Sequence, residues 1–93
     1  MANYFVTYDL YDPGQNYEAV EKAVQQCGDA GKVLQTVWYL SSAMSGEQIR
    51  SKVWSAMDAN DRLLVIEARM AWGQNIGDRW SVIARHWKTT ASV

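Results

Sequence analysis

The chain has 93 residues, 48% of them hydrophobic, and a formal net charge of −1. This length allows one domain, residues 1–93, and the composition excludes a disordered tail. The weak overall charge excludes tight nonspecific binding to a nucleic-acid duplex, which needs a strong excess of Lys and Arg. The charge is also uneven: residues 1–47 hold two basic and six acidic side chains, whereas residues 48–93 hold seven basic and four acidic ones.

The cysteine content and the lack of long apolar runs indicate the cellular compartment of the protein. The single cysteine, Cys27, cannot form an internal disulfide, which suits a reducing cytoplasm. No signal peptide is visible, and no run approaches the roughly 20 apolar residues of a membrane span. We expect a cytoplasmic protein that has no membrane partner.

The first expected element is a strand over residues 4–10, which is rich in aromatic and β-branched side chains. Pro13 then predicts a turn, after which Asn16 caps a helix that Gly28 ends. The apolar residues of this helix recur at helical spacing, and they are Tyr17, Val20, Val24 and Cys27.

Residues 32–41 are long for one strand, so we expect either a bent strand or two strands that meet near residues 36 and 37. Ser45 and Gln48 have capping-box spacing and open a second helix. The inner stripe of this helix contains Ile49, Val53, Ala56 and Met57. The last strand of this part covers residues 62–68.

The end of the chain, residues 69–93, is an extension whose form the sequence leaves open. Residues 73–77 resemble a loop, and Asp78 is placed to cap a short helix. A strand with Trp80, Val82 and Ala84 on one side also fits the pattern, but we favour the helix. Its apolar side would hold Trp80, Ile83, Ala84 and Trp87.

The order β-α-β-β-α-β predicts an α+β two-layer sandwich of the ferredoxin-like type, with both helices on one face of the sheet and a C-terminal extension. Both faces of the predicted sheet are apolar, however, and two helices cover only one. An uncovered apolar face marks an interface, so we expect a homodimer, or else a C-terminal tail that folds across this face. The expected dimer face contains Val33, Val37, Tyr39, Leu63 and Val65.

Asp9 interrupts the apolar first strand at its carboxyl end, and Asp12 follows in the turn. Two carboxylates on one rim suit a hard cation such as Mg²⁺, which activates water and neutralises phosphate. The alternative is structural: Asp9 accepts hydrogen bonds from turn amides and Asp12 prepares the turn. Spacing alone favours the structural alternative.

The extension also contains a basic and aromatic stretch, made of Arg79, Trp80, Arg85, Trp87 and Lys88. Such residues stack on and clamp a single nucleic-acid strand, or they form an amphipathic helix that docks on the sheet, which we prefer slightly. His86, the only histidine, is expected to lie in solvent. The chain contains no glycine-rich phosphate loop and no zinc-ligand spacing.

Three short segments resemble a known family: residues 6–10 (Val-Thr-Tyr-Asp-Leu), 35–38 (Gln-Thr-Val-Trp) and 61–66 (Asp-Arg-Leu-Leu-Val-Ile). In order and spacing they are similar to the CRISPR-associated protein two family and its stand-alone relatives, including the virulence-associated protein D group. The similarity spans about residues 4–68. Thr36 and Trp38 stand where the family pattern has Ser and Phe. Near Lys32 the chain lacks the family's further basic residues.

The resemblance implies a ferredoxin-like homodimer in which Asp9 of each subunit occupies the metal-binding, catalytic position. Family members act either as Mg²⁺-dependent nucleases or as structural adaptors. Two functions therefore stay open. One is a dimeric module from a phage or mobile element that binds a protein or a nucleotide-like ligand and interferes with host defence. The other is a Mg²⁺-dependent endonuclease that acts through Asp9 on RNA or DNA.

Overall fold

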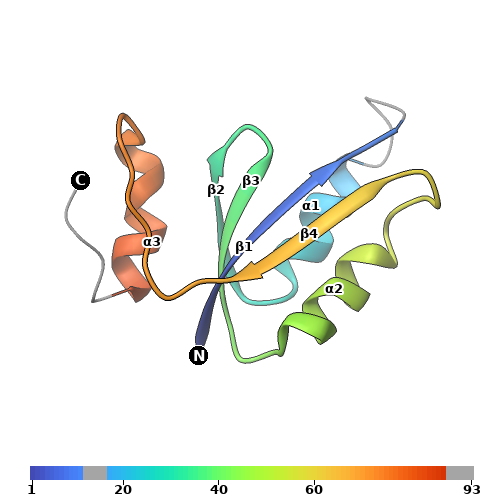
Figure 1. The fold of residues 1–93 in the computed structure, drawn as a ribbon, viewed down its shortest axis with the longest axis horizontal. Helices are drawn as coiled ribbons and strands as arrows, with labels where there is room; N and C mark the ends of the chain where they lie inside the picture. Colours follow the sequence, from blue (N-terminus) through green and yellow to red (C-terminus); the bar gives the residue numbers. More distant parts are fainter. Residues whose placement is uncertain (12–16, 88–93) are drawn as a thin grey trace.

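The computed structural model describes residues 1–11 and 17–87, which form a four-stranded sheet with helices on both of its faces (Figure 1). The elements in chain order are β1 (Ala2–Asp9), α1 (Tyr17–Gln25), β2 (Asp29–Leu34), β3 (Val37–Ser42), α2 (Gly46–Trp54), β4 (Arg62–Glu67), the 3₁₀ helix η1 (Gly77–Trp80) and α3 (Ser81–His86). The α+β class expected from the sequence is confirmed. None of these helices is long and apolar enough to cross a membrane.

The strands lie in the order β2-β3-β1-β4, and each neighbouring pair is antiparallel. β1 and β3 are therefore central, whereas β2 and β4 are the edge strands. The long segment over residues 32–41 is two strands, because β2 ends at Leu34 and β3 begins at Val37. The two residues between them form the turn.

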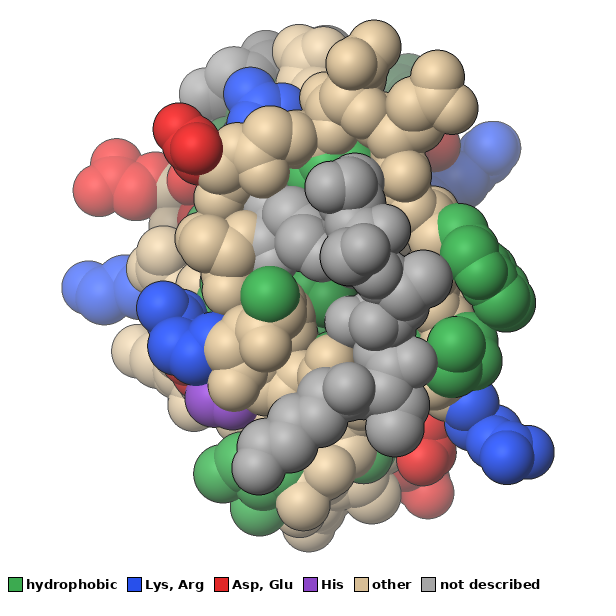
Figure 2. All heavy atoms as spheres, turned by 90° about the vertical axis from the view of Figure 1, so that its left-hand side faces the viewer, with side chains coloured by type: hydrophobic (Ala, Val, Ile, Leu, Met, Phe, Trp, Pro, Cys, Tyr) green, Lys and Arg blue, Asp and Glu red, His purple; other side chains and the backbone are tan. Residues whose placement is uncertain are grey.

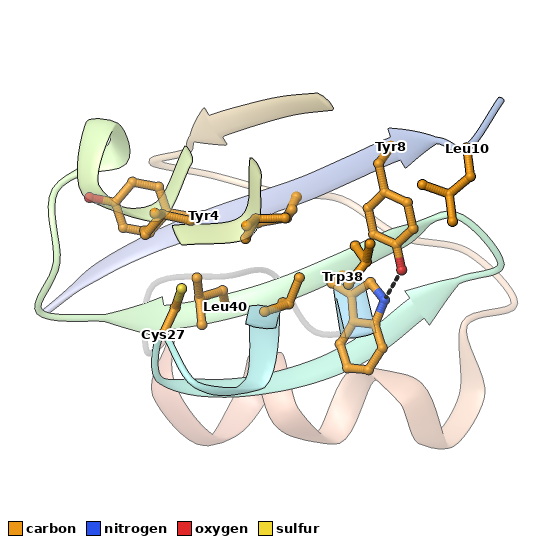
Figure 3. Packing of buried hydrophobic residues seen from close by; sticks show 11 residues of the cluster. Tyr4, Tyr8, Leu10, Cys27, Trp38 and Leu40 are labelled. Carbon is orange, nitrogen blue, oxygen red and sulfur yellow. Dashed lines mark hydrogen bonds between the residues drawn. The ribbon is translucent and has the colours of Figure 1, made fainter. Parts of the chain in front are cut away.

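The larger hydrophobic cluster lies between the sheet and the helices α1 and α2 (Figure 3). Along β1, Tyr4, Val6 and Tyr8 alternate with less buried residues, as the two-residue period of a strand requires. The buried Trp38 indole donates a hydrogen bond from Nε1 to the Tyr8 hydroxyl at 3.2 Å, so neither ring loses its polar partner on burial. The members contributed by the helices are Val20, Val24, Ile49 and Val53.

Helix α2 begins as its sequence predicts. The Ser45 hydroxyl accepts a hydrogen bond from the Gln48 backbone N–H at 3.2 Å, and the Gln48 side chain accepts one from the Ser45 N–H at 2.8 Å. This reciprocal capping box satisfies two amides that the first turn of a helix leaves without partners.

A second, smaller hydrophobic cluster lies on the opposite face of the sheet, where α3 packs over β2 and β3 (Figure 1). Val82, Ile83 and Trp87 pack there against Val33 and Tyr39. The helix preferred from the sequence is thus present, although its buried side contains Val82 while Ala84 is exposed. Part of the open face is therefore covered by the chain's own C-terminal segment, which was the alternative to a second subunit.

Helix α3 approaches β2 so closely that only glycine fits beneath it. A Cβ atom on Gly31 would lie 2.4 Å from Val82 Cγ1, well inside van der Waals contact. The missing side chain at position 31 is therefore what gives Val82 its place on the sheet.

The register of β4 divides the expected dimer face between the two sides of the sheet. Val65 lies opposite Val6, and both Leu63 and Val65 pack against the α1–α2 cluster. Leu64 and Ile66 point to the other side, the face that carries α3. Val33 and Tyr39 lie on this second face beneath α3. The five residues expected together thus do not share one surface.

Candidate functional sites

Asp9 ends β1 and is exposed, with Arg62 of β4 directly opposite in the strand register. The two residues border a shallow cavity of about 220 Å³ that Thr7 and Leu64 also line. Asp9 and Arg62 also border a second cavity of about 150 Å³, which lies beside Tyr11 and Asn60. The strand end that the sequence singled out is therefore a polar hollow with one acidic and one basic side chain.

A carboxylate close to this hollow, that of Asp61, has a structural role. It is buried, and its Oδ1 accepts a hydrogen bond from the Tyr11 N–H at 2.7 Å, while Oδ2 accepts one from the Asp58 N–H at 2.8 Å. Asp61 thus ties the turn before β4 to the end of β1. In the sequence Asp61 stands directly before the expected strand over residues 62–68, and its hydrogen bond to residue 11 has no local sequence signal.

Of the two carboxylates expected to hold a magnesium ion, the structure describes only Asp9. Among residues 1–11 and 17–87, no three His, Cys, Asp or Glu side chains lie close enough to hold a metal ion. Asp9 brings one carboxylate and faces a cation, and the second expected ligand, Asp12, lies outside the described residues. Because Mg²⁺ is usually held by one or two carboxylates together with waters and substrate phosphates, the magnesium site at this end stays a prediction.

A charged cluster that the sequence did not reveal joins the start of β2 to the end of α3. The Asp29 carboxylate accepts hydrogen bonds from one Arg85 guanidinium nitrogen at 3.1 and 3.3 Å. Its Oδ2 is also bonded to His86 Nε2. The hydrogen bond from His86, assisted by the positive charge of Arg85, lowers the pKa of Asp29 below its ordinary value. His86, expected in solvent, is partly buried and partnered.

His86 also borders a cavity of about 810 Å³, which we call the α3-end cavity. It lies where the end of α3 meets the start of β1 and the end of β4. Its polar lining consists of Asn3, Glu67, Arg69 and His86, and its apolar lining includes Met70 and Trp87. Cavities of several hundred Å³ with a few polar groups are typical of small-molecule sites.

The expected basic and aromatic stretch is divided by the fold. Trp87 is only 3% exposed, stacked on Tyr39 and tilted against Phe5, and its Nε1 donates to the Arg69 carbonyl at 3.0 Å. Its ring thus serves the packing of α3. Arg79 is exposed and Arg85 is paired with Asp29. The Trp80 side chain and Lys88 lie outside what the structure describes.

Large apolar side chains are exposed along β4 and the segment after it. Leu64 is 56% and Ile66 44% exposed, and Met70 and Trp72 follow in the segment toward α3. Figure 2, which views the α3 side of the molecule, shows hydrophobic side chains gathered at one margin of this face. These residues form an apolar stretch that the described helices leave uncovered.

Comparison with known proteins yields no relative: no family model, no curated protein and no solved structure matches this chain.

Proposed function

We propose that the chain is a small homodimeric binding module with a ferredoxin-like fold, and that two copies pair along β4. The strand order β2-β3-β1-β4, with antiparallel neighbours and with α1 and α2 on one face, supports this fold. A domain of 93 residues buries a modest share of its surface and gains stability from a partner.

The observation that carries the proposal is the exposure of Leu64 and Ile66 on an edge strand. An edge strand presents unpaired backbone groups, and proteins usually protect such an edge with charges, proline or a bulge. β4 begins with Arg62 and ends with Glu67, and the four residues between them are all aliphatic. This middle part of the strand therefore contains no charge and no proline. A strand of this kind is suited to pairing with another strand.

Pairing of two β4 strands satisfies both the backbone and the exposed side chains. In an antiparallel pair centred on Val65, Leu64 of each copy lies opposite Ile66 of the other copy, on the same face. The four side chains then cover one another. The pair would also join the two sheets into one continuous sheet of eight strands.

Sedimentation or light scattering at micromolar concentration tests the proposal with two matched variants. The unmodified protein is expected at twice the mass of one chain, and Leu64→Ser is expected at the mass of one chain. Leu34→Ser is the control, because Leu34 is 48% exposed on the opposite edge strand and should leave the dimer intact. A monomeric unmodified protein, or equal loss of the dimer in both variants, contradicts pairing along β4.

The ligand of the module is proposed to be a protein or a nucleotide-like molecule. The resemblance stated from the sequence supports a phage or mobile-element origin and a role against host defence. Pull-down from host extracts with the Leu64→Ser variant and the unmodified protein side by side would show whether a partner requires the dimer. Recovery of no host protein by either form would contradict a protein ligand.

The alternative, a Mg²⁺-dependent endonuclease acting through Asp9, is favoured only by the polar hollow that Asp9 and Arg62 border. It conflicts with pairing along β4. Arg62, opposite Asp9, lies three residues from Val65, so the two copies of Asp9 would be about 20 Å or more apart at 3.3 Å per residue. Cleavage of labelled RNA or DNA with Mg²⁺, lost in Asp9→Asn, would establish the nuclease and overturn the edge-paired dimer.

A further inference from the structure

Trp72 is a large aromatic side chain that the chain leaves 77% exposed. It lies in the segment between β4 and η1, which contains neither a helix nor a strand. The preceding residue, Ala71, packs against the hydrophobic cluster under α3, so the segment is held on the sheet beside an outward-facing ring. Trp72 continues the apolar stretch of Leu64, Ile66 and Met70. Tryptophan is typical of the side chains that anchor protein interfaces.

The hollow of about 220 Å³ at the end of β1 has the size of one large side chain. Asp9 lies directly opposite Arg62, and Thr7 lies opposite Leu64. Residues directly opposite in a sheet point to the same face, so these four side chains share the face that carries α3. Within residues 1–11 and 17–87, neither Asp9 nor Arg62 forms an ion pair. An acceptor and a cation beside an aliphatic side chain thus remain for an occupant.

Pairing along β4 brings the exposed segment of one copy to the hollow of the other. In the antiparallel pair proposed above, Glu67 falls opposite Leu63 of the other copy. The next residue, Ala68, falls opposite Arg62 of the other copy. Because β4 ends at Glu67 and the chain then leads to α3 (Figure 1), the segment begins beside this hollow and on its face of the sheet. Paired strands lie about 4.8 Å apart and five extended residues span up to about 17 Å, so Trp72 is within reach.

We infer that Trp72 of each copy inserts into the hollow that Asp9 and Arg62 border on the other copy. The indole Nε1–H donates a hydrogen bond to the Asp9 carboxylate, which is only an acceptor. The Arg62 guanidinium lies over the face of the ring, an arrangement that attracts a cation, and Leu64 packs against its edge. Two-fold symmetry makes the contact twice. The inference rests on the proposed pairing along β4 and identifies the side chains that give it specificity.

The dissociation constant of the dimer, measured by sedimentation over a range of concentrations, tests the inference. Trp72→Ala removes the anchor and is expected to raise this constant at least about thirtyfold. Trp72→Phe keeps a ring but has no N–H to donate, and is expected to raise it about tenfold. Trp54→Phe is the matched control, because Trp54 ends α2 on the opposite face of the sheet. It should leave the dissociation constant unchanged.

Asp9→Ala identifies the acceptor of the indole N–H. It should weaken the dimer of the unmodified protein about tenfold and leave the Trp72→Phe dimer unchanged, because that ring donates nothing to Asp9. Equal weakening in both backgrounds, or a Trp72→Ala dimer as tight as the unmodified one, would overturn the inference and leave pairing along β4 standing. A monomeric unmodified protein would overturn both, so the two failures are distinguished.

Discussion

Replacement of Gly31 by alanine is the sharpest test of how α3 is held on the sheet. The added Cβ would lie 2.4 Å from Val82 Cγ1 and 3.0 Å from Val82 Cβ. The Gly31 backbone does not adopt a positive φ, so alanine is compatible with the strand itself. In an open site the exchange would raise stability by about 0.4–1 kcal/mol by restricting the unfolded chain. Any loss of stability must therefore come from the contact with α3.

The magnitude follows from the stiffness of Val82. Valine has one strongly preferred rotamer in a helix, so the clash is relieved only by moving α3. Overpacking of this kind costs about 1–3 kcal/mol. Full release of α3 would expose Val82, Ile83 and Trp87, each of which contributes about 1.5–3 kcal/mol when buried. We expect Gly31→Ala to lower the free energy of unfolding by about 1–3 kcal/mol.

Urea denaturation followed by tryptophan fluorescence measures this loss, and a double-mutant cycle assigns it to Val82. Val82→Ala removes the methyl group that the new Cβ would meet, so the double variant should be more stable than the sum of the single losses predicts, by about 1 kcal/mol or more. Gly46→Ala is the control, because its Cβ would meet only Tyr4 Cε1 at an ordinary 3.6 Å. Additive losses within about 0.5 kcal/mol, or a Gly31→Ala variant as stable as the unmodified protein, would refute the packing argument.

Three further changes test the other contacts. Ser45→Ala removes the N-cap of α2 and should cost about 1 kcal/mol in urea denaturation, with an unchanged midpoint contradicting the capping box. Asp61→Asn replaces one of the two acceptors for the amides of Tyr11 and Asp58 by a donor; it should cost about 1–3 kcal/mol, and retained protection of the Tyr11 amide against hydrogen exchange would contradict the tie. Asp29 has a pKa lowered below 3.8 in the folded chain, so its contribution is present above that pH and is lost as the pH falls through the folded value. The stability difference between the unmodified protein and Asp29→Asn, under about 1 kcal/mol because the pair is exposed, should disappear in acid, and a difference that grows in acid would reverse the assigned sign.

The local patterns of the sequence predicted most of the elements. Aromatic and β-branched runs marked β1, β3 and β4, and Ser45 with Gln48 marked the start of α2, because each signal lies within a few residues of its effect. The first half of β2, from Asp29 to Gly31, has no such run and was not predicted. These local patterns did not predict to which face of the sheet each side chain of β4 points. Leu63 and Val65 are as apolar as Leu64 and Ile66, so a two-residue period does not tell which pair is buried.

The candidate sites were harder to predict from the sequence than the fold, because their residues meet only through long-range contacts. Asp29 and His86 are separated by 57 positions, and neither residue has a neighbour in sequence that indicates the other. Asp9 was found because a carboxylate at the end of an apolar strand is a local anomaly. The α3-end cavity contains no such anomaly, since Asn3, Glu67 and Arg69 are ordinary residues at strand ends.

The position of α3 separates the cavity at its end from the proposed dimer edge. Helix α3 covers β2 and β3 but leaves Leu64 and Ile66 of β4 exposed, and its end supplies His86 and Trp87 to the cavity. Displacement of α3 in Gly31→Ala should therefore change the cavity and leave the β4 edge as it is.

The same variant should keep the mass of a dimer, because β4 and its edge do not depend on α3. Light scattering on a Gly31→Ala sample, with the folded fraction taken from its urea curve, measures this mass. Loss of the dimer would show that α3, and not the β4 edge, joins the two copies.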